Sequence, residues 1–274
     1  MTAELGKRTR RTTTGVIWES RSLILHMVKR EIAGRYRGSA LGILWAMLTP
    51  LLMLAVYTFV FGTVFKARWV DAGATAPEFA ILLFSGLILF QLFAEVVNGA
   101  PRLIIDNVNY VKKVVFPLEI LPVVAVGVAL FHGAVSLIVF LAFILAFTGS
   151  LAVTALLLPI VWLPFLLFVL GLAWLLASLG VFFRDISQLL NTIVTALLFL
   201  SPIFYPSTAL PQWLRPYLFL NPLTLPIEQT RDVLIWGRAP DLADFISYAV
   251  VTSIVAWLGY LWFQRTRKGF ADVL

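Results

Sequence analysis

The sequence predicts an all-α polytopic membrane protein with six transmembrane helices. Hydrophobic residues make up 61% of its 274 residues, and its mean hydropathy is +0.95, whereas soluble domains contain clearly fewer apolar residues. A bilayer core about 30 Å thick requires roughly 20 apolar residues per helix, and the chain contains six stretches of about that length or longer. These stretches leave room for short connections only, so we expect one membrane domain and no separate soluble domain.

The N-terminal region is expected to lie outside the membrane core. Residues 1–15 are polar and basic, and we expect them to be disordered. Residues 16–38 carry too many charges to span a bilayer, but their apolar residues fall mostly on one helical face, which predicts an amphipathic helix at the membrane interface. These apolar residues are Val16, Ile17, Leu23, Ile24, Met27, Val28 and Ile32. No cleavable signal peptide is visible, so the first span is expected to act as an internal signal.

A transmembrane domain is predicted over residues 39–265, followed by a tail at 266–274. The six predicted spans cover about 40–65, 79–100, 117–147, 151–183, 188–205 and 243–263. The fourth is long enough to be tilted, or broken at Pro159 and Pro164. Residues 206–241 are rich in proline and only moderately apolar. They predict short re-entrant helices before the last span, because irregular backbone survives at membrane depth only where protein or water shields it.

The distribution of basic residues predicts the orientation. With both termini in the cytoplasm, 16 of the 21 Lys and Arg residues lie on the cytoplasmic side, and the opposite topology would leave five there. Lys and Arg concentrate in cytoplasmic loops, so we expect cytoplasmic N- and C-termini. The net charge of +7 then indicates contact with membrane lipid rather than with nucleic acid.

The sequence lacks the residues that several kinds of chemistry require. It contains no cysteine for disulfides or thiolate metal sites, and no G-x-x-x-x-G-K-[ST] motif to hold a nucleotide. Glu95 and Glu119 fall near the cytoplasmic ends of the second and third spans, whereas coupled carriers usually keep a carboxylate deep in the bilayer. His26 and His132 are expected to be structural. We therefore expect a chain that is not an enzyme and binds no metal or cofactor; if it moves a substrate, the energy should come from another chain.

The connection between the second and third spans, residues 101–116, is a candidate contact surface for that chain. It has the length of a short helix, and its apolar residues could bury one face. The residues that could then face a partner are Asp106, Asn107, Asn109 and Lys112. From composition alone, an ordinary positively charged cytoplasmic loop explains the segment equally well.

Five motifs follow one another in an order that resembles a known family. The first is Arg35-Tyr36-Arg37-Gly38-Ser39 with Leu41-Gly42, Trp45 and Pro50, and the second is Asn107 through Lys113 with Phe116-Pro117-Leu118-Glu119-Ile120-Leu121-Pro122. The others are Phe183-Arg184-Asp185-Ile186, Ser201-Pro202-Ile203-Phe204-Tyr205 and Asn221-Pro222-Leu223. Spread over about residues 20–265, they resemble ABC-2 type (type V exporter-like) permeases, and more closely the subunits that export O-antigen and related bacterial polysaccharides.

The resemblance implies a permease that moves undecaprenyl-diphosphate-linked polysaccharide, with O-antigen favoured, from the cytoplasm to the periplasm across a bacterial inner membrane. It implies a homodimer paired with two copies of a separate cytoplasmic ABC ATPase, which would bind the ATP and Mg²⁺. The interface helix and the 101–116 loop would dock on the ATPase, and the re-entrant helices would gate the exit. Glu119 would either cap the third span or contact the ATPase, and we group it with the coupling loop.

Two further sets of residues are candidates for contact with the substrate. Arg35 and Arg37 are expected to hold the lipid diphosphate by charge-assisted bonds; the alternative is that they anchor the protein to anionic headgroups. Aromatic rings bind the C–H faces of sugars without strong directional bonds, so some of the aromatic residues are candidates for lining the channel; the alternative is that they face lipid or the bundle core. The aromatic candidates are Trp45, Tyr57, Phe59, Phe90, Phe93, Phe199 and Tyr205.

Rival functions remain open at this point. An ABC-2 exporter of capsule, teichoic acid, a drug or another lipid would share the spans and the coupling loop. A membrane-embedded lipid-linked sugar transferase would need a cluster of Asp, Glu, Lys or His at one membrane face, and the 14 acidic residues are scattered along the chain.

Overall fold

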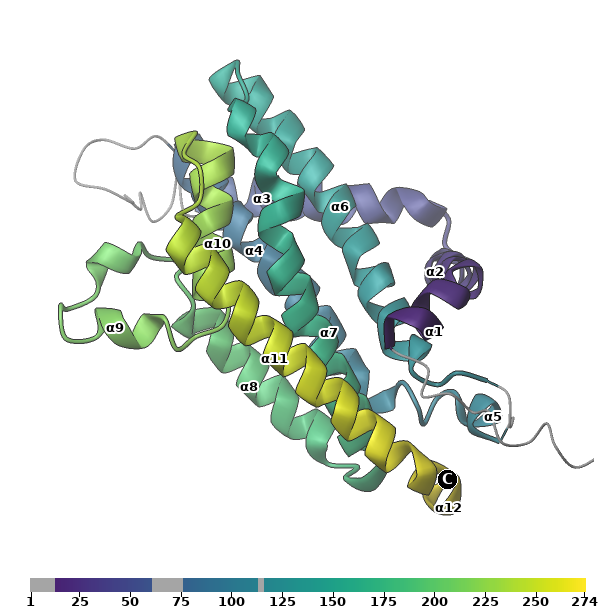
Figure 1. The fold of residues 1–274 in the computed structure, drawn as a ribbon. Coiled ribbons are helices and arrows are strands. Elements are labelled where there is room, and N and C mark those ends of the chain that lie inside the picture. Colours follow the sequence, from purple (N-terminus) through teal and green to yellow (C-terminus); the bar gives the residue numbers. More distant parts are fainter. Residues whose placement is uncertain (1–12, 61–75, 113–115) are drawn as a thin grey trace, which may run out of the picture.

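The computed structural model describes residues 13–60, 76–112 and 116–274. The expected disorder of residues 1–12, the predicted end of the first span at 61–65, and Lys113 lie outside the described residues. Within the described ranges the chain forms helices and turns without a β-strand (Figure 1), which confirms the all-α prediction.

Long helices form a bundle, and short helices gather at its two ends. The long helices are α2 (Arg21–Tyr36), α3 (Trp45–Tyr57), α4 (Ala76–Gly99), α6 (Ile120–Thr148), α7 (Leu158–Phe182), α8 (Ile186–Leu200) and α11 (Leu242–Thr266). The short α-helices are α1 (Thr13–Glu19), α5 (Val108–Val111), α9 (Arg215–Leu218), α10 (Thr224–Arg231) and α12 (Phe270–Val273). The 3-10 turns are η1 (Gly42–Leu44), η3 (Ala100–Arg102), η4 (Val153–Leu157), η5 (Ser207–Ala209) and η7 (Arg267–Gly269), and η6 (Asp232–Trp236) is π-helical. In Figure 1, α1, α2, α5 and α12 gather at one end of the bundle, called the α2 end below, and α9 and α10 lie toward the opposite end, called the α10 end.

Five helical segments of the described chain are long and apolar enough to cross a bilayer. They are Gly42–Val60, Glu78–Arg102, Ile120–Thr148, Val153–Phe182 and Leu242–Val273. They correspond to five of the six predicted spans. The possible break in the fourth span does not occur, because Pro159 lies in the first turn of α7 and the helix continues through Pro164.

The fifth predicted span, residues 188–205, is shorter than expected. α8 contains 15 residues, fewer than the roughly 20 that cross a bilayer core. The helix stops where Ser201 adopts an extended backbone and Pro202 follows. The Ser201 hydroxyl accepts a hydrogen bond from Nδ2 of Asn221 at 2.9 Å, so the end of α8 is tied to the segment that carries α9 and α10.

α2 does not separate its polar and apolar residues as cleanly as predicted. One apolar row packs against the bundle, mainly on α6, and consists of Ile24, Met27, Val28 and Ile32. Leu23 remains 40% exposed and Leu25 59% exposed, because each lies one position from a residue of that row and hence about 100° around the helix. Apolar residues therefore occupy two faces, and the predicted amphipathic helix is packed on the bundle along one of them. Residues 13–15, expected to be disordered, belong to α1.

Short helices fill the segment between α8 and α11, as its prolines predict. Arg231, one of the five basic residues that the charge count places outside, is however 1% exposed. Its guanidinium donates to the carbonyl oxygens of Leu82 at 3.1 Å and Ile203 at 3.3 Å, and it pairs with Glu228 at 3.3 Å. Arg231 is thus not an exposed loop charge; it attaches α10 to α4 inside the bundle.

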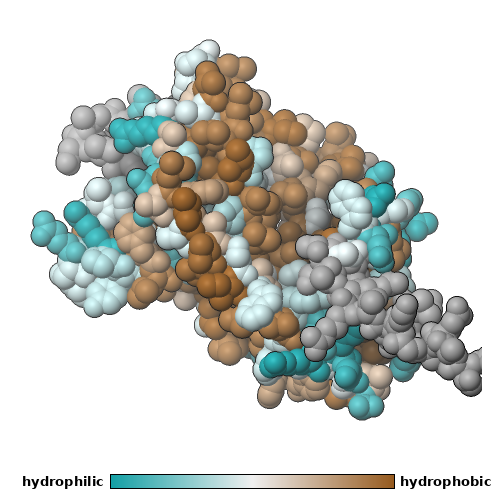
Figure 2. Space-filling view, in the orientation of Figure 1, coloured by the Kyte–Doolittle hydropathy of each residue, from teal (hydrophilic) through white to brown (hydrophobic). Residues whose placement is uncertain are grey.

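The helices are buried to different degrees. α4 is mostly buried at the centre of the bundle. α7 and α11 touch backbone to backbone: a Cβ at Gly171 would lie 2.6 Å from Cα of Ala256, and one at Gly259 would lie 2.1 Å from the Gly171 carbonyl oxygen. α3, α8 and the outer face of α11 expose many large apolar side chains. Figure 2 shows apolar residues over the middle of the molecule and hydrophilic residues toward its two ends, a distribution that fits a bilayer.

Candidate functional site

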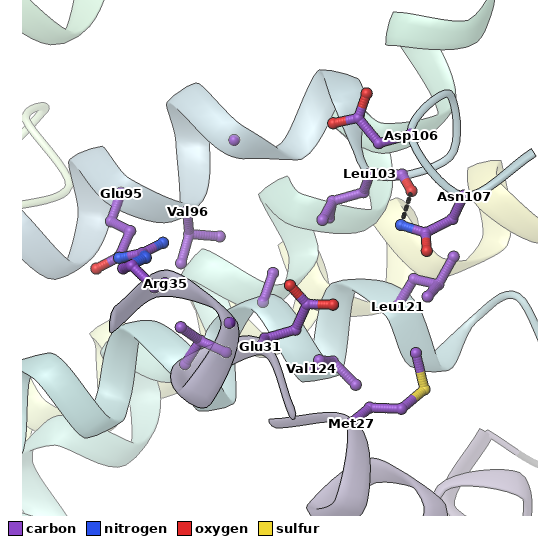
Figure 3. Close-up of a pocket in the computed structure, with 14 residues that line it drawn as sticks. Met27, Glu31, Arg35, Glu95, Val96, Leu103, Asp106, Asn107, Leu121 and Val124 are labelled. Atoms are coloured by element: carbon purple, nitrogen blue, oxygen red, sulfur yellow. Dashed lines mark hydrogen bonds and ion pairs between the residues drawn. The ribbon is translucent and has the colours of Figure 1, made fainter. Parts of the chain in front are cut away.

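A cavity of about 530 Å³ lies at the α2 end, between α2, α4, α6 and the segment that follows η3. Its apolar lining comprises Met27, Val96, Leu103, Leu121, Val124 and Val128, with smaller residues between them. In Figure 3, Arg35 and Glu95 lie at one end of the cavity, Asp106 and Asn107 at the other, and Glu31 between them. The structure thus brings together Arg35 and two residues of the predicted coupling loop, which the sequence assigned to separate roles.

Three polar side chains from three helices meet at the Arg35 end of this cavity. Nη1 of Arg35 lies 2.5 Å from Oε1 of Glu95, and Nδ1 of His132 lies 3.0 Å from both carboxylate oxygens. Arg35 and His132 also approach within 3.2 Å, but when Nδ1 carries a proton both groups are donors, so Glu95 is their shared acceptor. The cluster ties the end of α2 to α4 and α6, and sequence analysis missed both Glu95 and His132 as its members.

The two predicted diphosphate-binding arginines differ in their surroundings. The Arg35 side chain is 50% exposed, so its guanidinium can still be reached from outside while it is bound to Glu95. Arg37 follows α2 as its C-terminal cap residue and is exposed. Its side chain forms no ion pair with the residues that the structure describes. A diphosphate would therefore compete with Glu95 at Arg35 and would meet an available guanidinium at Arg37.

The predicted coupling loop places most of its polar residues on the surface of the α2 end. Asp106, Asn109 and Lys112 are exposed, and Asn107 is half-buried. The Asn107 side chain donates from Nδ2 to the Leu103 carbonyl at 2.9 Å, so it stabilises the turn before α5. Three of these four residues are thus open to a partner.

Glu119 is not on this surface. It is 5% exposed, and Nη1 of Arg267 binds its Oε2 at 2.9 Å. Glu119 occupies the N-cap position of α6 without a side-chain capping bond, and its buried carboxylate connects the start of α6 to Arg267 after α11.

Three of the aromatic candidates are exposed on the helices whose outer faces are uncovered. Trp45 at the start of α3 is 40% exposed, Phe59 beyond its end is 61% exposed, and Phe199 at the end of α8 is 63% exposed. Tyr57 and Tyr205 are half-buried. These five side chains keep some surface with which to meet a substrate.

The other two aromatic candidates lie in the core of the protomer. Phe90 and Phe93 on α4 are 7% and 3% exposed, and Phe93 stacks on Phe168 with ring centroids 6.4 Å apart. The prediction that they line a channel is wrong for this structure, because α7 and other neighbours cover both rings.

A row of polar side chains on α8 was not singled out from the sequence. Gln188, Asn191, Thr192 and Thr195 are all exposed, and their spacing places them on one helical face. An open groove of about 470 Å³ follows this face as far as Phe199. The spacing is visible in the sequence as polar residues at helical period inside an apolar stretch, so this signal was available.

Comparison with known proteins places these features in a family. The family model described as ABC-2 type transporter matches residues 22–235. The chain is 30% identical over 258 residues to the O-antigen export system permease protein RfbA of Myxococcus xanthus, and the aligned region covers 93% of this chain and 96% of that protein. It is 27% identical over 256 residues to a protein of the same name from Klebsiella pneumoniae, with 92% and 95% covered. It is 26% identical over 242 residues to the polysialic acid transport protein KpsM of Escherichia coli, with 87% and 91% covered.

The family match extends from α2 to η6, and so includes the cavity at the α2 end, the polar row of α8 and the short helices of the α10 end. It therefore confirms the family that the five sequence motifs resemble. The chain belongs to the ABC-2 type transporter family.

Proposed function

We propose that this chain is the permease subunit of an ATP-driven exporter of undecaprenyl-diphosphate-linked polysaccharide, with O-antigen as the favoured cargo. Two copies of the chain would form a homodimer in a bacterial inner membrane, with both termini in the cytoplasm. Two copies of a separate ABC ATPase would bind at the α2 end and drive the polymer toward the periplasm. Support comes from the family match and from relatives named for O-antigen export.

The polar row on α8 is the observation that carries the proposal. The Thr192 and Thr195 hydroxyls donate to the Gln188 and Asn191 carbonyls. A lipid-facing helix nevertheless gains nothing from the exposed amides of Gln188 and Asn191, because amide groups without partners are costly in hydrocarbon. Asn191, Thr192 and Thr195 can exchange hydrogen bonds with successive sugar hydroxyls, and Phe199 can pack against sugar C–H faces. Such contacts are individually weak, so a polymer can slide along them.

In this proposal, the exposed face of α3 forms the other wall of the polymer path. Trp45 and Phe59 are exposed on it, and two copies that place α3 and α8 opposite each other would enclose an aromatic and polar channel. The lipid diphosphate would meet Arg37 and Arg35 at the α2 end. The alternative for these arginines, anchoring to anionic headgroups, uses the same positive charge, and lipid stimulation of the ATPase in Glu95→Gln distinguishes the two roles.

An acidic polysaccharide is the second candidate cargo. A relative over 87% of the chain is named for polysialic acid transport, and the polar row of α8 contains amides and hydroxyls but no charge. Neutral groups of this kind can bind both neutral and acidic sugars. The two cargoes are therefore distinguished by supplying each polymer in the export experiment.

The test is export in a host that makes lipid-linked O-antigen and lacks its own exporter. Co-expression of this chain with its ATPase should move polymer to the periplasm, and the doubly substituted Asn191→Leu, Thr195→Val variant should lower that amount several-fold at equal expression. Ser253→Ala, which removes an exposed hydroxyl from α11, is the matched control and should export normally. Polymer that stays in the cytoplasm with the unsubstituted chain would contradict the proposed function, and equal export by all variants would contradict the α8 path.

A further inference from the structure

A hydrogen bond joins α2 to α5, the short helix of the predicted coupling loop. Nη1 of Arg30 donates to the hydroxyl of Tyr110 at 3.0 Å, between residues 80 positions apart. Figure 1 shows α2 and α5 at the same end of the bundle. The bond therefore connects two elements of that end that present exposed polar side chains.

Other contacts fix the position of Tyr110 and of the part of α2 that carries Arg30. The Tyr110 ring stacks on Phe116 with ring centroids 4.3 Å apart and an interplanar angle of 11°, and its backbone N–H donates to the Asn107 carbonyl at 2.8 Å. Arg30 lies on the surface of α2, about one and a half turns before Arg35, which binds Glu95. α2 is thus attached to α5 at Arg30 and to α4 at Arg35, on either side of Glu31, which lines the cavity.

The exposed residues of the two elements are available to one partner at the same time. On α2 they include Arg21 and Lys29, and on the loop Asp106, Asn109 and Lys112. α2 and the loop share an apolar cluster, and the Arg30–Tyr110 bond adds a directional contact between their polar surfaces. A displacement of α5 by a partner would then reach α2 through this bond and, through Arg35, the cluster on α4 and α6.

We propose that Arg30 and Tyr110 are positioning residues that join α2 and α5 into one unit, so that a movement imposed by the ATPase on either element is transmitted to both. The inference rests on the proposed function for its partner, but the connection itself is a property of this chain. Because both groups are solvent-accessible, their bond contributes little to folding. Its loss should therefore alter coupling while leaving the fold intact.

The connection can be measured without transport. Since the chain contains no cysteine, spin labels can be placed on His26→Cys of α2 and Asn109→Cys of the loop in the full chain in lipid nanodiscs. Tyr110→Phe keeps the ring stack and removes only the hydroxyl, and it should broaden the distance distribution about twofold. Arg21→Gln removes a comparable charge from the start of α2, where Arg21 contacts Trp18 of the preceding α1 and not the coupling loop, and should leave the distribution unchanged. An equally narrow distribution in Tyr110→Phe would overturn the proposal.

Coupling is measured in the assembled complex with its ATPase. Arg30→Gln and Tyr110→Phe should each lower the amount of polymer exported per ATP hydrolysed several-fold, with hydrolysis retained. The double variant should be no worse than the more impaired single variant, because both remove the same bond. Additive losses would overturn the link. If the unsubstituted complex exports no polysaccharide, the proposed function fails, whereas the spin-label distances still decide whether α2 and α5 are joined.

Discussion

Arg267, which follows α11, and Glu119, which precedes α6, form an ion pair with a 2.9 Å Nη1–Oε2 distance across 148 positions of sequence. Trp174 of α7 donates its indole N–H to the Glu119 carbonyl at 3.0 Å. Glu119 thereby connects the start of α6 with the end of α11 and with α7, at the end of the bundle where the predicted coupling loop begins.

Arg267→Met should destabilise the protein, because the Glu119 carboxylate, 7% exposed, would stay buried without its charged partner. The expected loss of unfolding free energy is about 1–3 kcal/mol, measured by denaturant or thermal unfolding of the purified protein in detergent. Arg265→Met, at an exposed position two residues earlier, is the control. Equal losses in the two variants would show that the ion pair makes no particular contribution.

Gly180→Ala should disturb the turn that leads into the coupling loop. A Cβ at Gly180 would lie 2.1 Å from the carbonyl oxygen of Pro101 and 2.5 Å from its Cα, and Pro101 is itself buried. Overpacking of this kind costs about 1–3 kcal/mol, so the melting temperature should fall. Gly99→Ala meets no atom within 4 Å at the end of α4, and it should leave stability unchanged or raise it by up to about 1 kcal/mol. A Gly180→Ala protein that melts like the Gly99→Ala protein would refute the close contact.

Glu228 should make the unfolding free energy depend on pH. Burial raises the pKa of Glu228 above its ordinary value of 4.5, although the nearby Arg231 opposes the shift. Between the two values the folded protein holds more protons than the unfolded chain, so the unfolding free energy should fall as the pH rises from 4.5 through the raised pKa. Burial also raises the pKa of Asp232, which acts in the same direction.

Glu228→Gln should therefore flatten this part of the pH profile without removing it entirely, since Asp232 remains. The measurement is unfolding at a series of pH values. Asp244→Asn, at an exposed position on α11, should retain the original slope. A slope that is unchanged in Glu228→Gln would show that this carboxyl does not govern the pH dependence.

The Arg35–Glu95 pair separates the two roles considered for Arg35. If Arg35 binds the lipid diphosphate, Glu95→Gln removes the charge that competes for its guanidinium, and half-maximal stimulation of the ATPase by the lipid should need about threefold less lipid. This factor corresponds to about 0.7 kcal/mol, the scale of a partly exposed ion pair. Arg35→Gln combined with Arg37→Gln should abolish the stimulation at equal expression. If these arginines only anchor the protein to headgroups, lipid stimulation should be the same in all three proteins.

The helical fold could be predicted from the sequence because long apolar runs leave few alternatives in a bilayer. The end of α8 could not, since Ile203 and Phe204 continue the hydropathy of the span beyond Ser201. Ile203 is in fact 0% exposed, because the chain turns and packs it into the bundle. Hydropathy reports that a residue is removed from water, but not whether a helix or a turn places it there.

The candidate site also contains one feature that the sequence predicts and others that it does not. The polar row of α8 follows from the spacing of residues 188, 191, 192 and 195 alone. The contact of Arg35 with Glu95 and His132 cannot be predicted from residue spacing, because these residues lie 60 and 97 positions from Arg35. The order of the helices does not reveal which of their faces touch. Likewise, Glu119 belongs to the same motif as the coupling loop, but its partner comes from the end of the last span.

The contact between Gly171 and Gly259 has a mechanical consequence. Where two backbones touch through glycines, sliding one helix along the other by a single residue would drive a side chain into the facing chain. Two helices in such close contact therefore resist sliding along each other. α7 and α11 should therefore move as one body, and any widening of the proposed polymer path should occur at α3 and α8.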